Sequence, residues 1–333
     1  MNIQIRDILN KRYSTRNLSD EDFYDNLDSL ALQLSTVDYK PCHDEKSLKK
    51  DWDNLCRFDS SEKYLSSTSR IGMKICEHFF PNFYDIQTSK GFSFSKAWQD
   101  IDLLKKVLVW NRKSHSTPYL SELKRGIYFC SGSTKSTMYR PQMSKMITRG
   151  CKAVFDPCAG WGGRMIGAVA NKCKYYAFEP NTKTYENLQK VIAFLGIEKY
   201  THIINDSALN FYKYDIPKTE ICLTSPPYFD LEIYSDEETQ SINKVATYES
   251  WVKVFLNPLI EICINNLEHN GRSCWNVANI GKYKMWDDIN YAHAVNNCEY
   301  NCEYNIMSSV RQVNQNLNKN KKNTDKTIVY SRS

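Results

Sequence analysis

The spacing of apolar residues changes partway along the chain. Apolar positions recur every three or four residues in segments 22–34, 66–80 and 96–110, which is the spacing of one helix face. Beyond residue 150, short apolar runs alternate with helical segments. The pattern predicts a helical N-terminal region over residues 1–122 and an α/β domain over residues 123–333.

The second half of the chain reads as strands separated by helices. The predicted strands cover residues 152–158, 174–180, 201–206, 220–224 and 273–279. The predicted helices cover residues 164–171, 181–196, 247–269 and 284–297. Such an alternation favours a parallel sheet with right-handed crossovers. Two last strands, at residues 304–313 and 327–330, are expected to add a hairpin with one antiparallel strand.

One predicted strand stops at two prolines. The stretch 220–232, EICLTSPPYFDLE, is apolar until Thr224 and then turns. Consecutive prolines cannot continue a ladder, so they hold the flanking residues in a stiff turn at the strand's carboxyl end. Ligands bind at that end of open α/β sheets. The residues expected at this reaction centre are Ser225, Pro226, Pro227 and Tyr228.

Acidic residues close three successive predicted strands. Asp156 precedes a glycine-rich turn, FDPCAGWGGR, that allows the backbone to approach a ligand closely. Asp156 can organise loop amides or meet a cationic ligand group. Glu179 can accept hydrogen bonds from two ribose hydroxyls, and Asp206 from an adenine amino group. The glycine run does not fit G-x-G-x-x-G, and no phosphate-binding G-x-x-x-x-G-K-[ST] run is present.

The net charge of +6 is unevenly distributed. Residues 101–152 hold 11 Lys and Arg against two acids, and residues 311–333 hold six against one. Concentrated basic segments on an otherwise acidic chain favour a polyanionic partner. Phosphate contacts are expected from Lys135, Arg140, Lys145, Arg149, Lys319, Lys321 and Lys322.

The composition indicates the class of protein and its cellular location. Hydrophobic residues make up 41% of the chain and charged residues 25%, as in globular proteins. Neither a membrane-length apolar run nor a leader is recognisable, so a cytoplasmic location is expected. The 12 scattered cysteines suit reduced thiols. Cys298 and Cys302, in the repeat NCEYNCEY, lack a second ligand pair, so no metal site is expected.

The order FDPCAGWGG, FEP, IND and TSPPY, over residues 139–333, resembles the amino-group DNA methyltransferases that use S-adenosylmethionine. The resemblance implies a seven-stranded, Rossmann-like class I methyltransferase sheet with an antiparallel last strand. It matches the family's cofactor motif at Asp156, its catalytic [DNS]-P-P-[YF] at Ser225, and more loosely the segment covering the methionine end at Tyr139. Gly163-Arg164 departs from the usual continuation. The implied cofactor residues are Tyr139, Pro141, Asp156, Pro157, Cys158, Gly160, Gly162, Glu179, Pro180, Asp206 and Ser207.

The resemblance also implies the substrate. Ser225 and the Pro226 carbonyl would accept N–H bonds from an exocyclic amine, and Tyr228 would stack on a base flipped out of double-stranded DNA. Phe229, Tyr234 and Gln240 are expected on the substrate side. Target reading is expected from the N-terminal region or loops, because little chain follows the last strand. The enzyme would be a solitary, phage-type or restriction-modification methyltransferase.

Several readings stay open. A serine in the first position favours N4 of cytosine, with N6 of adenine as the alternative. An RNA base or protein glutamine methyltransferase is a further alternative, because such enzymes can use a similar turn. A non-catalytic cofactor-binding protein is a third class, against which the intact acids and turn argue.

Overall fold

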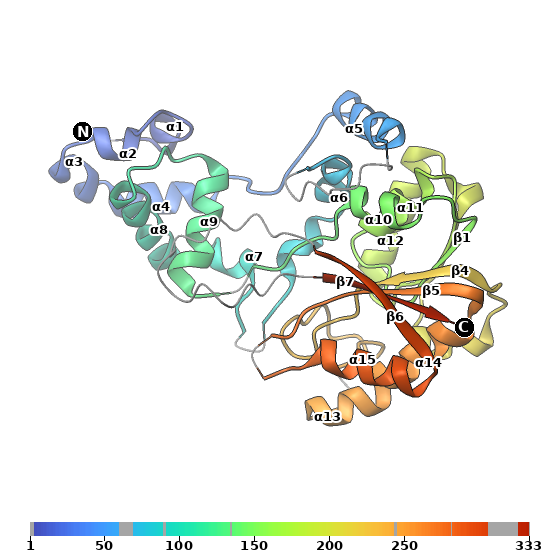
Figure 1. The fold of residues 1–333 in the computed structure, drawn as a ribbon. Helices are drawn as coiled ribbons and strands as arrows, with labels where there is room; N and C mark the ends of the chain where they lie inside the picture. Colours follow the sequence, from blue (N-terminus) through green and yellow to red (C-terminus); the bar gives the residue numbers. More distant parts are fainter. Residues whose placement is uncertain are drawn as a thin grey trace. The chain divides into compact units, whose positions relative to one another are not determined.

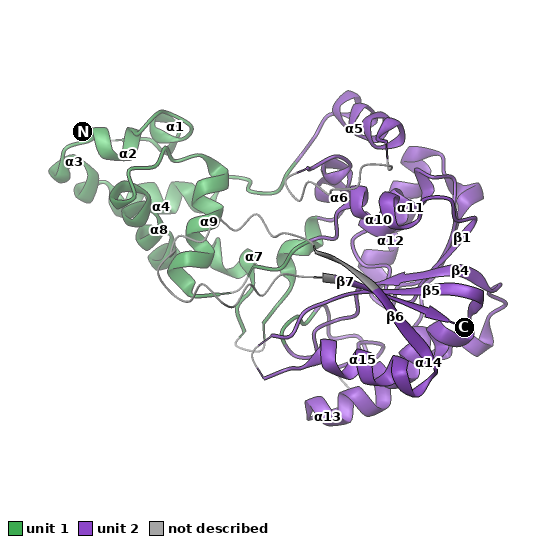
Figure 2. Ribbon diagram, viewed as in Figure 1, with its two compact units in different colours: residues 1–41, 81–137, 231–233 green, residues 42–80, 138–230, 234–333 purple. Residues whose placement is uncertain are grey.

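The computed structural model describes residues 3–59, 69–88, 91–133, 135–242, 245–280, 282–305 and 326–332. The chain forms two compact units (Figure 2). Unit 1 holds residues 1–41, 81–137 and 231–233, and unit 2 holds residues 42–80, 138–230 and 234–333. The sequence predicted one boundary after residue 122, whereas the structure assigns residues 42–80 to the same unit as the sheet.

Unit 1 is helical, as the apolar spacing predicted. Ser19 and Asp100 each cap a helix by accepting a hydrogen bond from the backbone N–H three residues on. Trp98 and Leu104 are fully buried in a core shared by most of these helices. The elements are α1 (Ile5–Ile8), α2 (Ser14–Asn17), α3 (Asp20–Asp25), α4 (Leu27–Ser35), η1 (Pro81–Asp85), α7 (Phe94–Ala97), α8 (Ile101–Lys113) and α9 (Leu120–Ser131).

Unit 2 is built on a seven-stranded sheet of order β3-β2-β1-β4-β5-β7-β6 (Figure 1). The five strands from β3 to β5 pair in parallel, and β7 is antiparallel to both of its neighbours. The predicted Rossmann-like sheet with an antiparallel last strand is therefore confirmed. The strands are β1 (Ala153–Asp156), β2 (Lys174–Phe178), β3 (Thr201–Ile204), β4 (Thr219–Thr224), β5 (Leu267–Val277), β6 (Cys298–Asn305) and β7 (Lys326–Arg332).

Helices cover both faces of this sheet (Figure 1). Asn181 caps the helix after β2 and Gly196, with φ 63°, ends it, as predicted. The elements are α5 (Glu45–Arg57), α6 (Met73–Phe79), α10 (Pro141–Ile147), α11 (Gly163–Val169), α12 (Thr182–Leu195), η2 (Glu198–Tyr200), η3 (Ala208–Lys213), α13 (Tyr248–Trp251), a π-helical turn (Val252–Leu256), α14 (Asn257–Asn265) and α15 (Met285–Val295).

Two predicted boundaries were wrong. The helix expected over residues 247–269 ends at Asn265, and β5 already begins at Leu267. Thr219 pairs with Leu267 but Ile221 with Arg272, so β5 bulges between these pairs, where Asn270 has φ 61°. Asn270 and Gly271 therefore lie in this strand bulge, beyond the end of the helix.

The repeat Asn297–Tyr304 supplies most of edge strand β6. Residues 306–313 of the expected strand lie outside the described residues.

Close packing of α10 on α11 depends on two glycines. A Cβ on Gly163 would lie 2.0 Å from the carbonyl oxygen of Tyr139, and one on Gly167 would lie 2.2 Å from that of Pro141. Only glycine admits a backbone this near. The departure from the family pattern at Gly163 therefore has a packing reason: it brings the chain at Tyr139 against the start of α11.

Candidate active site

Ser225 follows the last residue of β4 and is held by the neighbouring strand. Its Oγ donates to the carbonyl oxygen of Asn276, at 3.1 Å, and accepts from the Asn276 side-chain amide, at 3.4 Å. Asn276 lies near the end of β5, which pairs with β4. A hydroxyl oxygen has two lone pairs. One lone pair of Ser225 therefore remains for a further donor.

A chain of hydrogen bonds continues from Asn276 toward the segment before α10. Thr327 Oγ1 donates to Asn276 Oδ1, and the hydroxyl groups of Thr327 and Tyr139 lie 3.4 Å apart. Burial raises the pKa of Tyr139 well above its usual value, so the phenol stays protonated. The predicted cofactor residue Tyr139 is thus linked to the predicted catalytic residue Ser225 through β7 and β5. Pro141, two residues after Tyr139, begins α10 and packs at Gly72.

The residues after Ser225 separate into two environments. Pro226 is buried, whereas Pro227 and Tyr228 are partly exposed. Phe229 has φ 45° and is only 6% exposed. Its ring lies 5.7–6.0 Å from the rings of Tyr248, Trp251 and Tyr283. Phe229 therefore packs within an aromatic cluster, and its contact with the substrate stays a prediction.

Asp156 organises the loop after β1. Its carboxylate accepts from Cys158 N at 3.1 Å, Tyr175 Oη at 2.6 Å and Thr224 Oγ1 at 2.9 Å, and the side chain is fully buried. Arg164 Nε donates to it as well, at 2.6 Å. Of the two roles left open by the sequence, the structure shows the organisation of the loop. The cationic group that contacts Asp156 is the guanidinium of Arg164 and not a group of a ligand.

Arg164 is the residue of this site that sequence reasoning missed. Its guanidinium also donates to the carbonyl oxygen of Cys158 and lies 5.4 Å from the centroid of the Tyr139 ring. Burial lowers the pKa of Arg164, but the charge of Asp156, its hydrogen bond and the nearby Tyr175 and Cys158 together outweigh burial, so the net shift of the pKa is upward. The sequence did offer a signal for this pair. Arg164 is a basic residue in the first turn of an apolar helix, eight positions after the acid that ends the preceding strand.

Glu179 follows β2 and ties the glycine loop to the next helix. Its carboxylate accepts from Gly160 N at 2.7 Å and from Asn181 N at 3.0 Å, one bond to each oxygen. Burial raises the pKa of Glu179 to about 7, although these two backbone bonds act in the opposite direction. Each carboxylate oxygen keeps a second lone pair. The side chain can therefore still accept from a diol.

Asp206 follows β3, the next strand outward. Burial acts to raise its pKa, but hydrogen bonds from Asn210, Tyr214 and Ser207 N reverse this, and the pKa is lowered. Because β1, β2 and β3 are neighbours and parallel, the three acids end adjacent strands at one edge of the sheet. The grouping predicted from the sequence is therefore present in the fold.

The other predicted cofactor and substrate residues surround this edge. Gly160 and Gly162 have φ 58° and 71°, as a tight turn requires. Trp161, between them, lies 6.0 Å from the ring of Tyr234. Gln240 is 6% exposed, and its amide nitrogen has no hydrogen-bond partner in the described part of the chain. Of the remaining predicted residues, Pro157 is buried and Cys158, Pro180 and Ser207 are partly exposed.

The predicted phosphate contacts are only partly available. Lys145 is 4% exposed, and its ammonium donates to the carbonyl oxygens of Leu55 and Cys56 at the end of α5, so the expected phosphate contact is wrong. Arg140 is half-buried and donates to Ser69 O. The exposed candidates are Lys135 and Arg149. Lys319, Lys321 and Lys322 lie outside the described residues.

Two further searches bear on ligands and setting. Within the described ranges, no group of three or more His, Cys, Asp or Glu side chains is arranged to hold a metal ion. The same part of the chain contains no helix with the length and apolar content needed to cross a membrane.

Comparisons with known proteins find only weak likenesses. No protein-family model and no curated protein sequence matches it. Similar solved structures include TrmN from Thermus thermophilus (11% identity, TM-score 0.42, 58% of this chain and 49% of that one). An rRNA methylase from Streptococcus thermophilus shows 17% identity and a TM-score of 0.37 over 60% of this chain and 99% of that one.

A protein from Streptococcus mutans in complex with SAH is a third example, with 15% identity and a TM-score of 0.39 over 59% of this chain and all of that one. The match to the Thermus thermophilus chain spans about half of its length. Likenesses this weak leave the fold to be assigned from the strand order and strand directions of the chain itself: a seven-stranded Rossmann-like sheet closed by an antiparallel strand.

Proposed function

We propose that this protein transfers a methyl group from S-adenosylmethionine to an exocyclic amine of a DNA base, with N4 of cytosine as the preferred acceptor. The observation that carries the proposal is the pairing of Ser225 with Asn276, which leaves one lone pair of a fixed hydroxyl at the carboxyl end of β4. Ligands bind at this edge in sheets of this kind.

The residues at the strand ends fit the cofactor. Glu179 is a buried carboxylate with lone pairs left for a ribose diol, and Asp206 is an ionised acceptor one strand further out. The glycine loop between β1 and α11 lets the backbone pass close to the methionine portion. Bound here, the cofactor would supply a methyl group on a positively charged sulfur.

The turn at Ser225–Tyr228 suits an amine conjugated to a ring. Such an amine is a poor nucleophile because its lone pair is delocalised. Ser225 Oγ and the Pro226 carbonyl can each accept one N–H bond, which favours the tetrahedral amine and turns its lone pair toward the methyl donor. Transfer is then direct. Tyr228, partly exposed beside the turn, is the side chain available to stack on a flipped base.

The preference for cytosine rests on Ser225 itself, since the resembling family links serine in this position with N4-cytosine and Asp or Asn with N6-adenine. N6 of adenine is the second candidate because its amine presents the same two N–H groups. Residues that read the target sequence are expected in unit 1 and in loops of unit 2.

Incubation of the purified protein with methyl-labelled S-adenosylmethionine tests the proposal. Duplex DNA, single-stranded DNA, tRNA and a protein extract serve as acceptors, and labelled nucleosides are identified after digestion. We expect label in N4-methylcytosine. Ser225→Ala should lower kcat by about 100-fold with cofactor affinity unchanged, as loss of one positioned hydrogen bond does. Ser241→Ala, at a serine that instead contacts Trp251, is the matched control.

Label at N6 of adenine would overturn the cytosine assignment. Label only in RNA or protein would overturn the DNA assignment. A Ser225→Ala enzyme with the full rate would remove this hydroxyl from the mechanism.

A further inference from the structure

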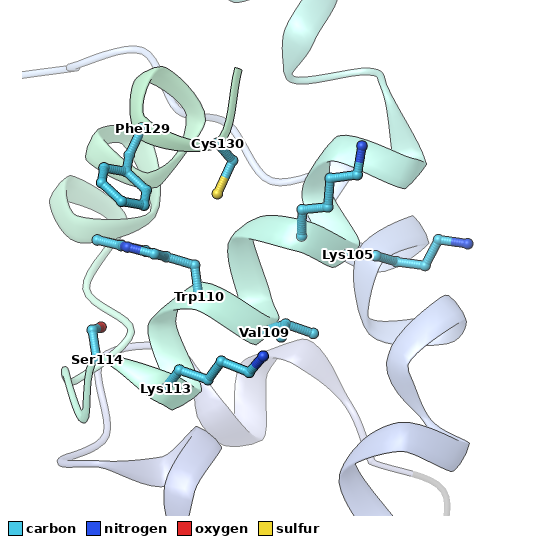
Figure 3. Close-up of a pocket in the computed structure, with 8 residues that line it drawn as sticks. Lys105, Val109, Trp110, Lys113, Ser114, Phe129 and Cys130 are labelled. Atoms are coloured by element: carbon cyan, nitrogen blue, oxygen red, sulfur yellow. The ribbon is translucent and has the colours of Figure 1, made fainter. Parts of the chain in front are cut away.

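Helices α8 and α9 of unit 1 line an open pocket of about 570 Å³ that the proposed reaction does not use. Two aromatic rings face each other in it: Trp110 from α8 and Phe129 from α9 (Figure 3). Their centroids are 5.5 Å apart and their planes are inclined by 36°. The Phe129 residue is 62% exposed. A large flat apolar surface is therefore open to solvent beside this pocket.

Gly126 holds the indole of Trp110 in a fixed position. A Cβ at residue 126 would lie 2.8 Å from Val107 Cγ1 and 3.0 Å from Trp110 Cε3, so the glycine lets α9 pack directly on the ring. The guanidinium of Arg125 lies 5.2 Å from the centroid of Trp110. The indole of Trp110 is consequently packed against α9 and Arg125.

Positive charge surrounds the rings. Lys105, Lys106 and Lys113 line the pocket. Lys105 is paired with Asp28 and Asp102, at 2.9 and 2.8 Å. Lys106 and Lys113 are exposed, and neither forms an ion pair with a described residue. They can therefore meet an external anion.

The two nearby acids form their ion pairs with other cations. Asp102 is engaged by Lys105, and Glu122 by Arg125 at 2.6 Å. The pocket thus joins an aromatic surface to two exposed lysines that form no ion pair with a described acid. Single-stranded nucleic acid is recognised by this combination, because every base has a π-face and every link carries a phosphate.

We propose that the pocket lined by Lys105, Lys106, Trp110, Lys113 and Phe129, here called the α8–α9 pocket, binds an unpaired segment of DNA. One base stacks on the exposed ring of Phe129, and Lys106 and Lys113 contact the adjoining phosphates. This assignment names the surface that holds the polymer substrate, and its choice of DNA rests on the proposed function.

Binding of a fluorescein-labelled single-stranded DNA 20-mer to the full chain, without cofactor, tests the pocket by fluorescence anisotropy. Phe129→Ala should weaken binding about ten-fold, which is the loss expected for one stacked base. The double variant Lys106→Gln, Lys113→Gln should reduce the slope of log Kd against log salt by about 1.4, or roughly 0.7 for each phosphate lost. Circular dichroism checks that each variant folds.

Matched controls come from the same unit. Tyr24 is an aromatic residue of α3 with 49% exposure, and Lys11 is an exposed lysine; neither lines the pocket. Tyr24→Ala and Lys11→Gln should leave affinity and salt slope unchanged. Wild-type affinity in Phe129→Ala together with a wild-type salt slope in the lysine variant would overturn the proposal. So would equal losses in the controls, or RNA of the same sequence bound more than ten-fold tighter than DNA.

The two proposals can fail separately. Methyl label found only in RNA or protein, with DNA binding still dependent on Phe129, would overturn the proposed function and leave the pocket assignment standing. Methyl label found in DNA, with binding that does not depend on Phe129 or the two lysines, would overturn the pocket assignment and leave the proposed function standing.

Discussion

The Nε atom of Arg164 lies 2.6 Å from Oδ2 of Asp156, and both side chains are almost completely buried. The pair joins the first turn of α11 to the end of β1. Arg164→Met should lower the free energy of unfolding by about 3–5 kcal/mol, because it leaves Asp156 buried without its counter-charge. Urea denaturation measures the change.

Arg149→Met, at an exposed position of the same unit, is the control and should change stability by less than about 0.5 kcal/mol. Arg164→Lys should restore little stability, since one ammonium cannot reach both Asp156 and the carbonyl of Cys158 as the guanidinium does. An Arg164→Met protein as stable as the wild type would contradict this account of the site.

Gly167 is predicted to be intolerant of even one added methyl group. A Cβ there would lie 2.2 Å from Pro141 O and 2.5 Å from Ser144 Cβ. Gly167→Ala should therefore separate α10 from α11 and cost about 3 kcal/mol, although alanine favours helices. Gly150→Ala tests backbone strain alone, since φ is 77° there and nothing crowds the added atom; about 1–2 kcal/mol is expected. Equal effects of the two substitutions on the melting curves would refute the packing argument.

Glu179 is predicted to make stability depend on pH. Its pKa is about 7 in the folded chain against an ordinary value of 4.5. The folded state therefore holds a proton that the unfolded state has lost between these values, and stability falls as pH rises through this window. The loss should total about 3 kcal/mol by pH 8. Comparison of wild type with Glu179→Gln in urea at pH 4–8 measures it; parallel stability curves for the two proteins would refute it.

The affinity for the cofactor should rise with pH, whereas the stability falls. A ribose diol donates to the carboxylate form, so binding of S-adenosylmethionine by Glu179 requires loss of this proton. Affinity should rise about ten-fold between pH 6 and pH 8 and then level off. Isothermal titration calorimetry measures it, with Glu179→Gln as a variant of weak, pH-independent binding. A flat profile in the wild type would contradict a role for Glu179 at the ribose.

Lys145 is predicted to serve stability and not nucleic-acid binding. Its ammonium donates to Leu55 O and Cys56 O at the end of α5, and burial lowers its pKa. Lys145→Met should cost about 1–3 kcal/mol of unfolding free energy by leaving these carbonyls without a donor. The salt slope of DNA binding should not change. A reduced slope with unchanged stability would restore the phosphate contact that the sequence suggested.

The sequence by itself determined the order of elements and the ends of the key strands. Pro226 and Pro227 stop β4 through their own covalent structure, and Gly160 and Gly162 allow the turn after β1 through theirs. The acids Asp156, Glu179 and Asp206 were found because each directly follows a short apolar run. These features are local, so they can be read from neighbouring residues.

Only the tertiary structure decided what the side chains at these positions contact. Ser225 is oriented by Asn276, 51 residues away. Arg164 forms an ion pair with Asp156, and Lys145 donates hydrogen bonds to backbone carbonyl groups at the end of α5. Phe229 is buried although it adjoins a partly exposed tyrosine, and residues 42–80 join the unit of the sheet. Charge and residue type do not specify such partners, because they depend on which segments the packed sheet and helices bring together.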